Sequence, residues 1–348
     1  MKNWEPISEE IRRKRLTPAG NGQREVVIDS DTKNEVDDQF AIAWALASSE
    51  RLHVQAVYAA PFSSGYLQRF LPGADVTHLM TADPAEGMRL SKEEAERLFR
   101  LMGKDPQGVV KDGSPRYLPG PDVPVDSPAA RDLIRRAHAC RETLYVITIG
   151  APTNVASALL MDPSIREKIT VVWLGGQPLT WPRTLEFNLS QDIHASRVLF
   201  DSGVPLVLIP CMSVASLLSV SAPELQEHLV GKSAVGDYLA GIVLEALSQE
   251  AARGTIAMFE KTYNLGLNDG PMEGDLPATP MAPTRIIWDT SAVAWVMNHR
   301  WCPSTLVRAP HLADDFRWIP GGEDRHLIRV VNYVYRDAVF GDLFARLG

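Results

Sequence analysis

Short apolar runs alternate with helical patterns along this chain, and that alternation constrains the fold more than any other feature. The runs are rich in Val and Ile, which is typical of strands buried on both faces of a sheet. Strands separated by helices pair in parallel, because each helix returns the chain to the same edge. We therefore expect an α/β fold: a mostly parallel open sheet flanked by helices, with a Rossmann-like core. The expected strands are Glu25–Ser30, Val54–Ala59, Leu144–Ile149, Thr170–Leu174 and Val204–Ile209.

Capping signals and apolar spacing between these runs predict the helices. Ser127 followed by Pro128 is a typical helix start, and Ser91 with Glu94 has the spacing of a capping box. Two stretches rich in Pro and Gly, residues 103–127 and 266–283, are expected to be long surface loops. The expected helices are Asp37–Ser49, Ser91–Met102, Pro128–His138, Thr153–Leu160, Asp192–Phe200 and Ser233–Ala251.

The chain of 348 residues is long enough for one large domain or two ordinary ones. It has no internal repeat, and neither loop stretch shows the shift in composition of a domain boundary. We predict an N-terminal extension over residues 1–23 and a single domain over residues 24–348.

The composition is globular, with 45% apolar and 22% charged residues. The net charge of −8 gives no attraction to nucleic acid or to an anionic membrane. No apolar run reaches the roughly 18–20 residues that span a bilayer, and the charged N-terminus lacks the apolar stretch of a signal peptide. The three cysteines lie far apart and indicate neither disulfides nor a thiolate metal site. We expect a soluble cytoplasmic protein.

A cluster of acidic residues follows the first expected strand, in the sequence VVIDSDTKNEVDDQ (residues 26–39). Ligands of open α/β sheets collect beyond the carboxyl ends of the strands, so this junction is a favoured place for a site. A structural interpretation also exists. Asp37 and Asp38 would stabilise the positive end of a helix dipole, and Asp29 and Asp31 would bond nearby loop amides.

That structural interpretation accounts for any two of these aspartates but not for all four. Like charges about 4 Å apart repel by roughly 4 kcal/mol at an effective dielectric of about 20, and Lys33 is the only cation in the stretch. A bound divalent cation would remove the repulsion. Oxygen ligands without Cys or His select a hard ion, Ca²⁺ or Mg²⁺, so the residues predict a metal site here.

Four segments in this order resemble motifs of the inosine–uridine-preferring nucleoside hydrolases. The first is the acidic junction, which is similar to a branch of the family with the form D-x-D-x-x-N-E-x-D-D-Q. The others are IGAPTN (residues 149–154), VWLGG followed by EFN and Asp192 (residues 172–192), and IWDTSAVA (residues 287–294). The resemblance spans about residues 25–298 and implies a nucleoside-hydrolase-like fold.

The resemblance implies hydrolysis of the N-glycosidic bond of a ribonucleoside or a related N-riboside. It implies one Ca²⁺ ion that binds the attacking water and the ribose hydroxyls. Carried over position by position, its ligands would be Asp31, Asp38, Asp289 and the backbone carbonyl of Ile149. Asp31 would also be the general base. Water would attack C1 directly, with inversion and without a carboxylate nucleophile.

The same resemblance implies contacts to the sugar. Asp37 would accept a hydrogen bond from the 2-hydroxyl, and Glu186 and Asn188 would hold the 5- and 3-hydroxyl side. From the residues alone, each assignment has a structural competitor. Glu186 and Asn188 would lie in a solvated loop, and Asp289 would only cap the helix Ser291–Met297.

Two departures from the family pattern concern the sugar. The loop between Asp31 and Asp37 is two residues longer than usual. Many members also have a sugar-binding asparagine after the second strand, where this chain has Pro61. Because proline offers no side-chain hydrogen bond, we predict that Asn34 in the longer loop contacts the sugar.

A third departure concerns the base. Trp288 precedes Asp289, where the inosine–uridine type has a histidine that protonates the leaving base. Purine-specific members have tryptophan there, and stacking raises the proton affinity of the base so that solvent can protonate it. We predict that Trp288 stacks on a purine base, with Trp181 and Tyr66 as further candidates for the other face.

Two other functions stay as alternatives. The residues DSDT (29–32) also resemble the D-x-D-x-T opening of haloacid-dehalogenase phosphatases. The second alternative is a homologue that binds a nucleoside or sugar without turnover, because Pro61 and Trp288 depart from the family pattern. The family resemblance also implies a homo-oligomer, a dimer or tetramer, with a small-molecule nucleoside as its partner.

Overall fold

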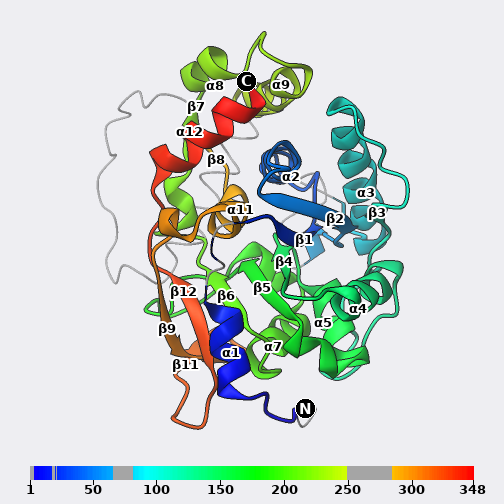
Figure 1. Ribbon diagram of the computed structural model, residues 1–348, viewed down its shortest axis with the longest axis vertical. Coiled ribbons are helices and arrows are strands. Elements are labelled where there is room, and N and C mark those ends of the chain that lie inside the picture. Colours follow the sequence, from blue (N-terminus) through cyan, green and yellow to red (C-terminus); the bar gives the residue numbers. More distant parts are fainter. Residues whose placement is uncertain (1–3, 18–19, 21, 66–80, 249–283) are drawn as a thin grey trace.

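The computed structural model describes residues 4–17, 20, 22–65, 81–248 and 284–348. Within these ranges, an eight-stranded sheet forms the centre of the molecule (Figure 1). Neighbouring strands pair in parallel except at one edge, where β9 is antiparallel to β12. In order across the sheet, the strands are β3 (Val110–Lys111), β2 (Leu52–Ala59), β1 (Arg24–Ser30), β4 (Leu144–Thr148), β5 (Ile169–Leu174), β6 (Leu206–Ile209), β12 (Leu327–Val331) and β9 (Ser304–Arg308).

The strand order β3-β2-β1-β4-β5-β6 is that of the doubly wound Rossmann fold. The predicted mostly parallel sheet with a Rossmann-like core is therefore confirmed. In this topology the strand order reverses between β1 and β4, and a crevice opens beyond their carboxyl ends. The acidic junction follows β1, and the IGAPTN segment follows β4. The fold thus brings two of the sequence motifs to the same crevice.

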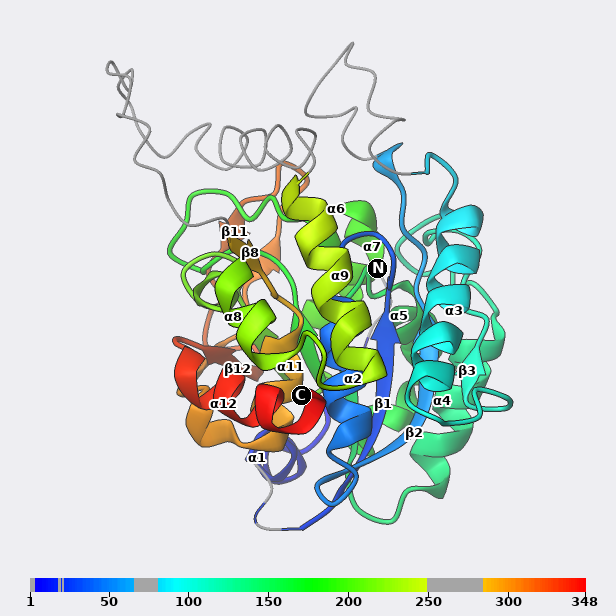
Figure 2. The same ribbon diagram turned by 90° about the horizontal axis from the view of Figure 1, so that it is seen from above.

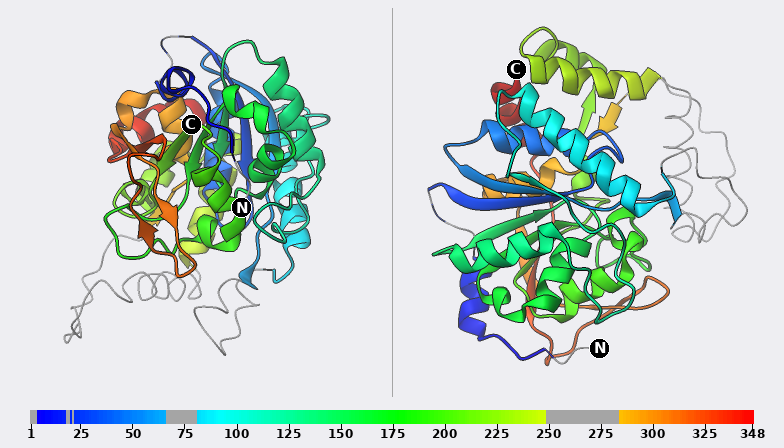
Figure 3. Two further views of the ribbon diagram at one scale, coloured as in Figure 1. Left: turned by 90° about the horizontal axis from the view of Figure 1, so that it is seen from below. Right: turned by 90° about the vertical axis from the view of Figure 1, so that its right-hand side faces the viewer.

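Helices cover both faces of the sheet. On one face, α2 packs against α3, α11 and α12 (Figures 1 and 2). On the other face, α5 packs between α4 and α7, and Figure 3 shows these green helices from below. The helices are α2 (Asp38–Ala47), α3 (Pro84–Leu101), α9 (Ala234–Ser248), α11 (Thr290–Met297) and α12 (Arg336–Leu347) on the first side, and α4 (Pro128–Ala139), α5 (Thr153–Met161) and α7 (Ile193–Asp201) on the second.

Shorter elements connect these layers. The connecting helices and paired strands are α1 (Glu9–Leu16), α6 (Phe187–Gln191), α8 (Ala222–His228), β7 (Ser219–Ser221) with β8 (Thr284–Ile286), β10 (His311–Leu312) with β11 (Trp318–Ile319), and the 3-10 helices η2 (Pro163–Glu167), η3 (Ala215–Leu217) and η4 (His299–Trp301). Of these, the β7–β8 pair and α6 contribute to the candidate site described below.

The alternation of side chains along each strand divides the core into two clusters. Val26 and Ile28 of β1 face one cluster, and Val27 between them faces the other. All three side chains are fully buried. Burial on both faces explains why these strands are continuous apolar runs rather than alternating ones.

Two expectations from the sequence need correction. The helix expected from Ser91 begins at Pro84, with Asp83 as its cap. Ser91 is buried within that helix, where its hydroxyl donates to the carbonyls of Ala60 and Gly87 rather than to a helix start. The stretch 103–127 contains the short strand β3. The expected loop 266–283 and the end of the helix expected to reach Ala251 lie outside the described residues.

The helix α1 lies against β5 and β12. Its Leu16 is fully buried, and the guanidinium of Arg12 donates to the carbonyl of Gly203 at 2.6 Å. The division into an extension (1–23) and one domain (24–348) stays a prediction. Among the described helices, none combines the length and apolar character needed to cross a membrane.

Candidate active site

A pocket of about 360 Å³ lies at the carboxyl ends of β1, β4 and β5. This volume is within the range of roughly 300–1,000 Å³ that small-molecule pockets occupy. Its wall includes five residues predicted to bind substrate, namely Asn34, Asp37, Glu186, Asn188 and Trp288, together with Ile149 and Asp289. The segments that resembled family motifs therefore meet at one place.

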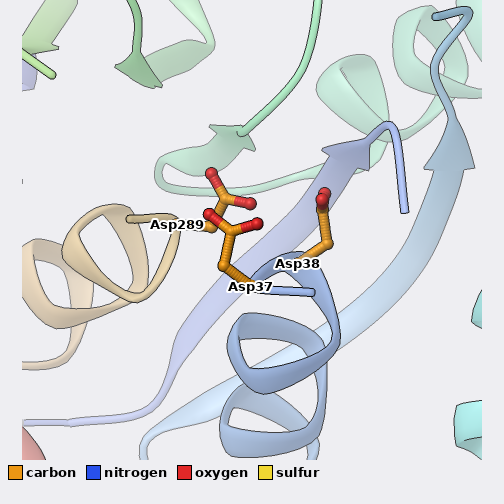
Figure 4. A group of neighbouring side chains, drawn as sticks. All are labelled: Asp37, Asp38 and Asp289. Carbon is orange, nitrogen blue, oxygen red and sulfur yellow. The ribbon is translucent and has the colours of Figure 1, made fainter. Parts of the chain in front are cut away.

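Three buried aspartates form the acidic end of the site. Carboxylate oxygens of Asp37, Asp38 and Asp289 all lie within 4.8 Å of one another (Figure 4). Asp37 and Asp38 stand at the start of α2, and Asp289 stands at the start of α11. Because α2 and α11 pack against each other, their N-terminal ends bring residues from distant parts of the chain together.

The structure tests the capping interpretation for two of these residues. Asp37 and Asp289 occupy the N-cap positions of α2 and α11, yet neither side chain makes a capping hydrogen bond. Their carboxylates point into the shared cluster instead (Figure 4). Asp289 is therefore not held by the helix-capping interaction that the sequence alone would favour.

Asp31 lies at the end of β1, next to the turn that follows β4. It is fully buried, and a Cβ atom placed on Gly150 would come within 3.0 Å of its Oδ1. Glycine at position 150 thus permits this close approach. The group within 4.8 Å contains Asp37 rather than Asp31, so the assignment of Asp31 as a metal ligand stays a prediction.

Burial and mutual repulsion dominate the electrostatics of these carboxyl groups. Burial raises the pKa of Asp31, Asp38 and Asp289 well above the usual value, and neighbouring carboxylates raise it further. Burial, with Glu35 nearby, raises the pKa of Asp37 to about 7. The cluster therefore retains protons unless a cation offsets its charge.

The same residues fit a metal ion. Both carboxylate oxygens of Asp31 and Oδ2 of Asp38 are buried without a hydrogen-bond partner among the described residues. Unpaired buried polar atoms are rare and indicate a missing ion or ligand. Since all donors in the cluster are oxygens, they suit a hard cation. The hydroxyl of Ser30 donates to the other oxygen of Asp38 and fixes its orientation.

Asp29 has different surroundings. Its Oδ1 accepts a hydrogen bond of 2.8 Å from the amide of Asn154, whose own oxygen accepts 2.7 Å from the backbone N–H of Ser114. Burial raises the pKa of Asp29 to about 7. Asn154, the last residue of the IGAPTN segment, thus ties β1 to the neighbouring loop, which supports a structural role for Asp29.

Glu186 and Asn188 are not in a solvated loop, so that expectation is wrong. Glu186 is buried at the start of α6, where its carboxylate accepts hydrogen bonds from the backbone N–H groups of Asn188, Leu189 and Gly176 at 2.8–2.9 Å. Burial raises its pKa to about 7, and these donors oppose the shift. Asn188 is fixed by its amide, which donates to the carbonyl of Leu174 at 3.0 Å.

An ion pair in the pocket wall was missed by the sequence analysis. Glu35, in the longer loop, accepts a hydrogen bond of 2.7 Å from Arg285 of β8. The two residues are 250 positions apart, and no local pattern marks the short β7–β8 pair that places Arg285. The remaining lining residues are Leu174, Trp181, Phe187, Cys211, Met212, Ser216, Ser219, Thr284 and Ile286. Tyr66 lies outside the described residues.

Comparison with known proteins identifies the family. The chain matches the family described as inosine-uridine preferring nucleoside hydrolase over residues 26–309. It belongs to this family. The pyrimidine-specific ribonucleoside hydrolase RihA of Salmonella enteritidis PT4 is 28% identical over 230 residues, which are 64% of this chain and 70% of that protein.

Two solved structures illustrate the shared nucleoside hydrolase fold. The purine-preferring ribonucleoside hydrolase from Gardnerella vaginalis matches with a TM-score of 0.64 at 18% sequence identity. The match covers 93% of this chain and 98% of the Gardnerella chain. The type III effector protein XopQ, solved in complex with adenosine diphosphate ribose, matches with a TM-score of 0.59 at 18% sequence identity. That match covers 97% of this chain and 96% of the XopQ chain. At these identities the likeness concerns the fold.

Membership in the nucleoside hydrolase family fixes the class of chemistry. The protein is an enzyme that hydrolyses N-glycosyl bonds, and its family is metal-dependent. The phosphatase interpretation of the DSDT segment is therefore wrong. Those residues are the end of β1 and the first turn of the nucleoside hydrolase site.

Proposed function

We propose that this nucleoside hydrolase cleaves a purine ribonucleoside, or a related N-riboside, in a Ca²⁺-dependent reaction that inverts C1 and releases base and ribose. The observation that carries the proposal is a pocket whose wall combines four carboxylates with two tryptophans. Carboxylates favour the positive charge of an oxocarbenium-like transition state. Indole rings offer a flat apolar surface for a base.

The predicted metal ligands are Asp31, Asp38, Asp289 and the carbonyl of Ile149. The unpaired oxygens of Asp31 and Asp38 and the closeness of Asp38 to Asp289 support this set. When bound there, Ca²⁺ would lower the pKa of a water molecule and offset the repulsion between the carboxylates. The absence of Cys and His from the cluster supports Ca²⁺ or another hard ion over zinc.

The protein's own groups perform the remaining steps. Asp31 accepts the proton of the attacking water, as a general base. Asp37 accepts a hydrogen bond from the 2-hydroxyl, while Glu186, Asn188 and Asn34 bind the other hydroxyls. The three backbone donors on Glu186 hold its carboxylate in place before substrate arrives, which reduces the reorganisation that binding requires.

The base end of the pocket supports a purine. Trp288 and Trp181 both line it, so either ring surface can contact a bicyclic base. The related proteins include a pyrimidine-specific and a purine-preferring enzyme, and XopQ was solved with an N-riboside that is not a simple nucleoside. We further propose that the enzyme acts in the cytoplasm as a dimer or tetramer.

A reducing-sugar assay over purine and pyrimidine nucleosides tests the proposal. ADP-ribose is itself a reducing sugar, so its cleavage is followed by chromatography of the released adenine. Purine nucleosides should give the highest kcat/KM, EDTA should abolish the activity, and added Ca²⁺ should restore it. The first sugar anomer seen by NMR should be the inverted one. Asp31→Ala should lower kcat by about 10³-fold, within the range for loss of a general base.

The exposed residue Asp337 offers a matched control, because it lies in an ion pair with Arg336 away from the pocket. Asp337→Ala should leave kcat unchanged. Full activity of Asp31→Ala, or binding of nucleosides without release of sugar by the wild-type protein, would contradict the proposal.

A further inference from the structure

Arg285 has an unusual place in the pocket. Of the described residues that line it, Arg285 is the one cation, among the carboxylates of Glu35, Asp37, Glu186 and Asp289. No histidine is among these lining residues. The wall therefore offers one positively charged donor to a substrate, and that donor is a guanidinium.

The contacts of Arg285 are incomplete. Its Nη2 donates to Glu35 at 2.7 Å, but its Nε is buried without a hydrogen-bond partner among the described residues. The side chain is only 14% exposed, so water cannot surround the unpaired donor freely. Buried donors without partners are rare in folded proteins. A hydrogen-bond acceptor on the substrate would give this donor a partner.

Glu35 keeps the guanidinium charged and fixes one side of it. The carboxylate of Glu35 raises the pKa of Arg285 above its usual value. Glu35 also contacts α2: its backbone carbonyl accepts a weak hydrogen bond of 3.4 Å from the side-chain amide of Gln39. Arg285 can thus donate hydrogen bonds throughout the reaction but cannot give up its proton.

The chemistry of the leaving group calls for such a donor. When the C1–N bond breaks, its electron pair passes to the base, and the negative charge spreads over the ring. Trp288, which stands where other members have histidine, carries no group that can protonate the base. A guanidinium in a largely buried wall stabilises developing negative charge far better than water does.

The shape of the guanidinium indicates which base it suits. Its planar fork presents parallel N–H donors to two adjacent acceptors. The 6-oxopurines carry such a pair, O6 and N7, whereas adenine carries a donor at position 6 beside N7. Both acceptors also gain charge as the purine leaves.

We propose that Arg285 binds the O6–N7 edge of a 6-oxopurine riboside and stabilises the departing base, with Glu35 as the residue that positions it. This inference deepens the proposed nucleoside hydrolysis and rests on it. A bond forms between the water oxygen and C1 while the C1–N bond breaks. The water proton passes to Asp31, the electron pair passes to the base, and the base takes its proton from solvent.

Two substrates with different leaving groups test the role of Arg285. Inosine needs stabilisation of its base, whereas 4-nitrophenyl β-ribofuranoside releases a stable anion without an O6–N7 edge. Arg285→Gln should lower kcat/KM for inosine by about 100-fold, the loss typical of one such donor. It should change the value for the nitrophenyl riboside little. Glu35→Gln should also lower kcat/KM for inosine more than for the nitrophenyl riboside, but by a smaller factor than Arg285→Gln.

Arg285→Lys is the control for folding, because it keeps a charge opposite Glu35. It should restore part of the inosine activity while losing the preference for inosine over adenosine, since an ammonium lacks the fork. Arg89 is an exposed arginine of α3, and Arg89→Gln should leave kcat/KM unchanged for both substrates. Equal losses on inosine and nitrophenyl riboside, or no loss on inosine, would overturn the role of Arg285 alone. A wild-type protein that cleaves neither would overturn the proposed function as well.

Discussion

Acidic residues begin helices on two sides of the pocket, but only on one side do they cap them. Glu186 and Asp192, at the starts of α6 and α7, accept hydrogen bonds from the backbone N–H groups of the first turn. Asp37 and Asp289, at the starts of α2 and α11, accept none. Acidic side chains at the same helix position are therefore hydrogen-bonded to the helix in one pair and free of it in the other.

The difference shows how many acceptor sites each carboxylate keeps for a ligand: Glu186 uses three on backbone N–H groups, whereas Asp37 and Asp289 use none on the helices that they begin. A capping carboxylate directs most of its lone pairs at backbone donors, and these donors offset part of the cost of burying its charge. The carboxylates of Asp37 and Asp289 are buried next to other carboxylates, a costly arrangement unless an ion or substrate completes it. A helix start that does not cap thus indicates a functional residue more strongly than its sequence position does.

The largest effect is expected for Asp289, in the pair that does not cap, and it concerns both activity and stability. Asp289→Asn should lower kcat by about 10³-fold, as expected for a group acting close to the reacting atoms. It should also raise the Tm of EDTA-treated protein at pH 8, because burial and its acidic neighbours raise the pKa of Asp289 well above the usual value. Steady-state kinetics and thermal unfolding measure the two effects.

Asp192→Asn is the matched change on the capping side. The carboxylate of Asp192 accepts from Leu118, Thr153 and Ala195, and an amide group cannot accept from all of them. This variant should lose about 1–3 kcal/mol of stability, the cost of a buried donor left unpaired. If both variants were destabilised equally in the metal-free protein, the distinction between the two sides would fail.

The sequence was sufficient for features that depend on neighbouring residues. The strands of the parallel sheet are buried on both faces, so Val26, Val27 and Ile28 form an apolar run that needs no distant partner to be seen. The acidic junction was visible for the same reason, since Asp31, Asp37 and Asp38 follow one strand. Its place at the switch point then follows from the strand order.

Contacts between distant residues leave no local pattern, so those outside the family motifs could not be predicted. Glu35 and Arg285 meet only because β8 pairs with β7 beside the pocket. The role of Glu186 as a cap needs the N–H of Gly176, which the turn after β5 supplies. The error at Ser91 was local: Asp83 and Glu86 have the same spacing as Ser91 and Glu94, and the helix begins at the earlier pair.

The protonation of Glu186 makes the capping side sensitive to pH. Burial raises the pKa of Glu186 from 4.5 to about 7. Between these values the folded protein keeps a proton that the unfolded chain has released, so the free energy of unfolding falls as the pH rises. The shift corresponds to about 3 kcal/mol. Glu186→Gln should lack this part of the slope in urea unfolding between pH 4.5 and 7.5.

A slope that is unchanged in Glu186→Gln would mean that the backbone donors already stabilise the charged form fully. The charged form of Glu186 would then be as stable in the folded protein as in water, unlike the carboxylates of the uncapped cluster. Asp337→Asn is again the control, since its side chain is 95% exposed.

The smallest expected effect concerns a cap far from the pocket. Asp83 caps α3 by accepting a hydrogen bond of 3.0 Å from the N–H of Ala85. Asp83→Ala should cost about 1 kcal/mol of stability in urea unfolding, the usual loss for an N-cap, whereas Asp83→Asn should cost almost nothing because asparagine caps equally well. Both variants should retain the wild-type kcat. A fall in kcat in both variants would contradict this expectation, because it would show that the carboxylate of Asp83 affects the active site as well as the stability of α3.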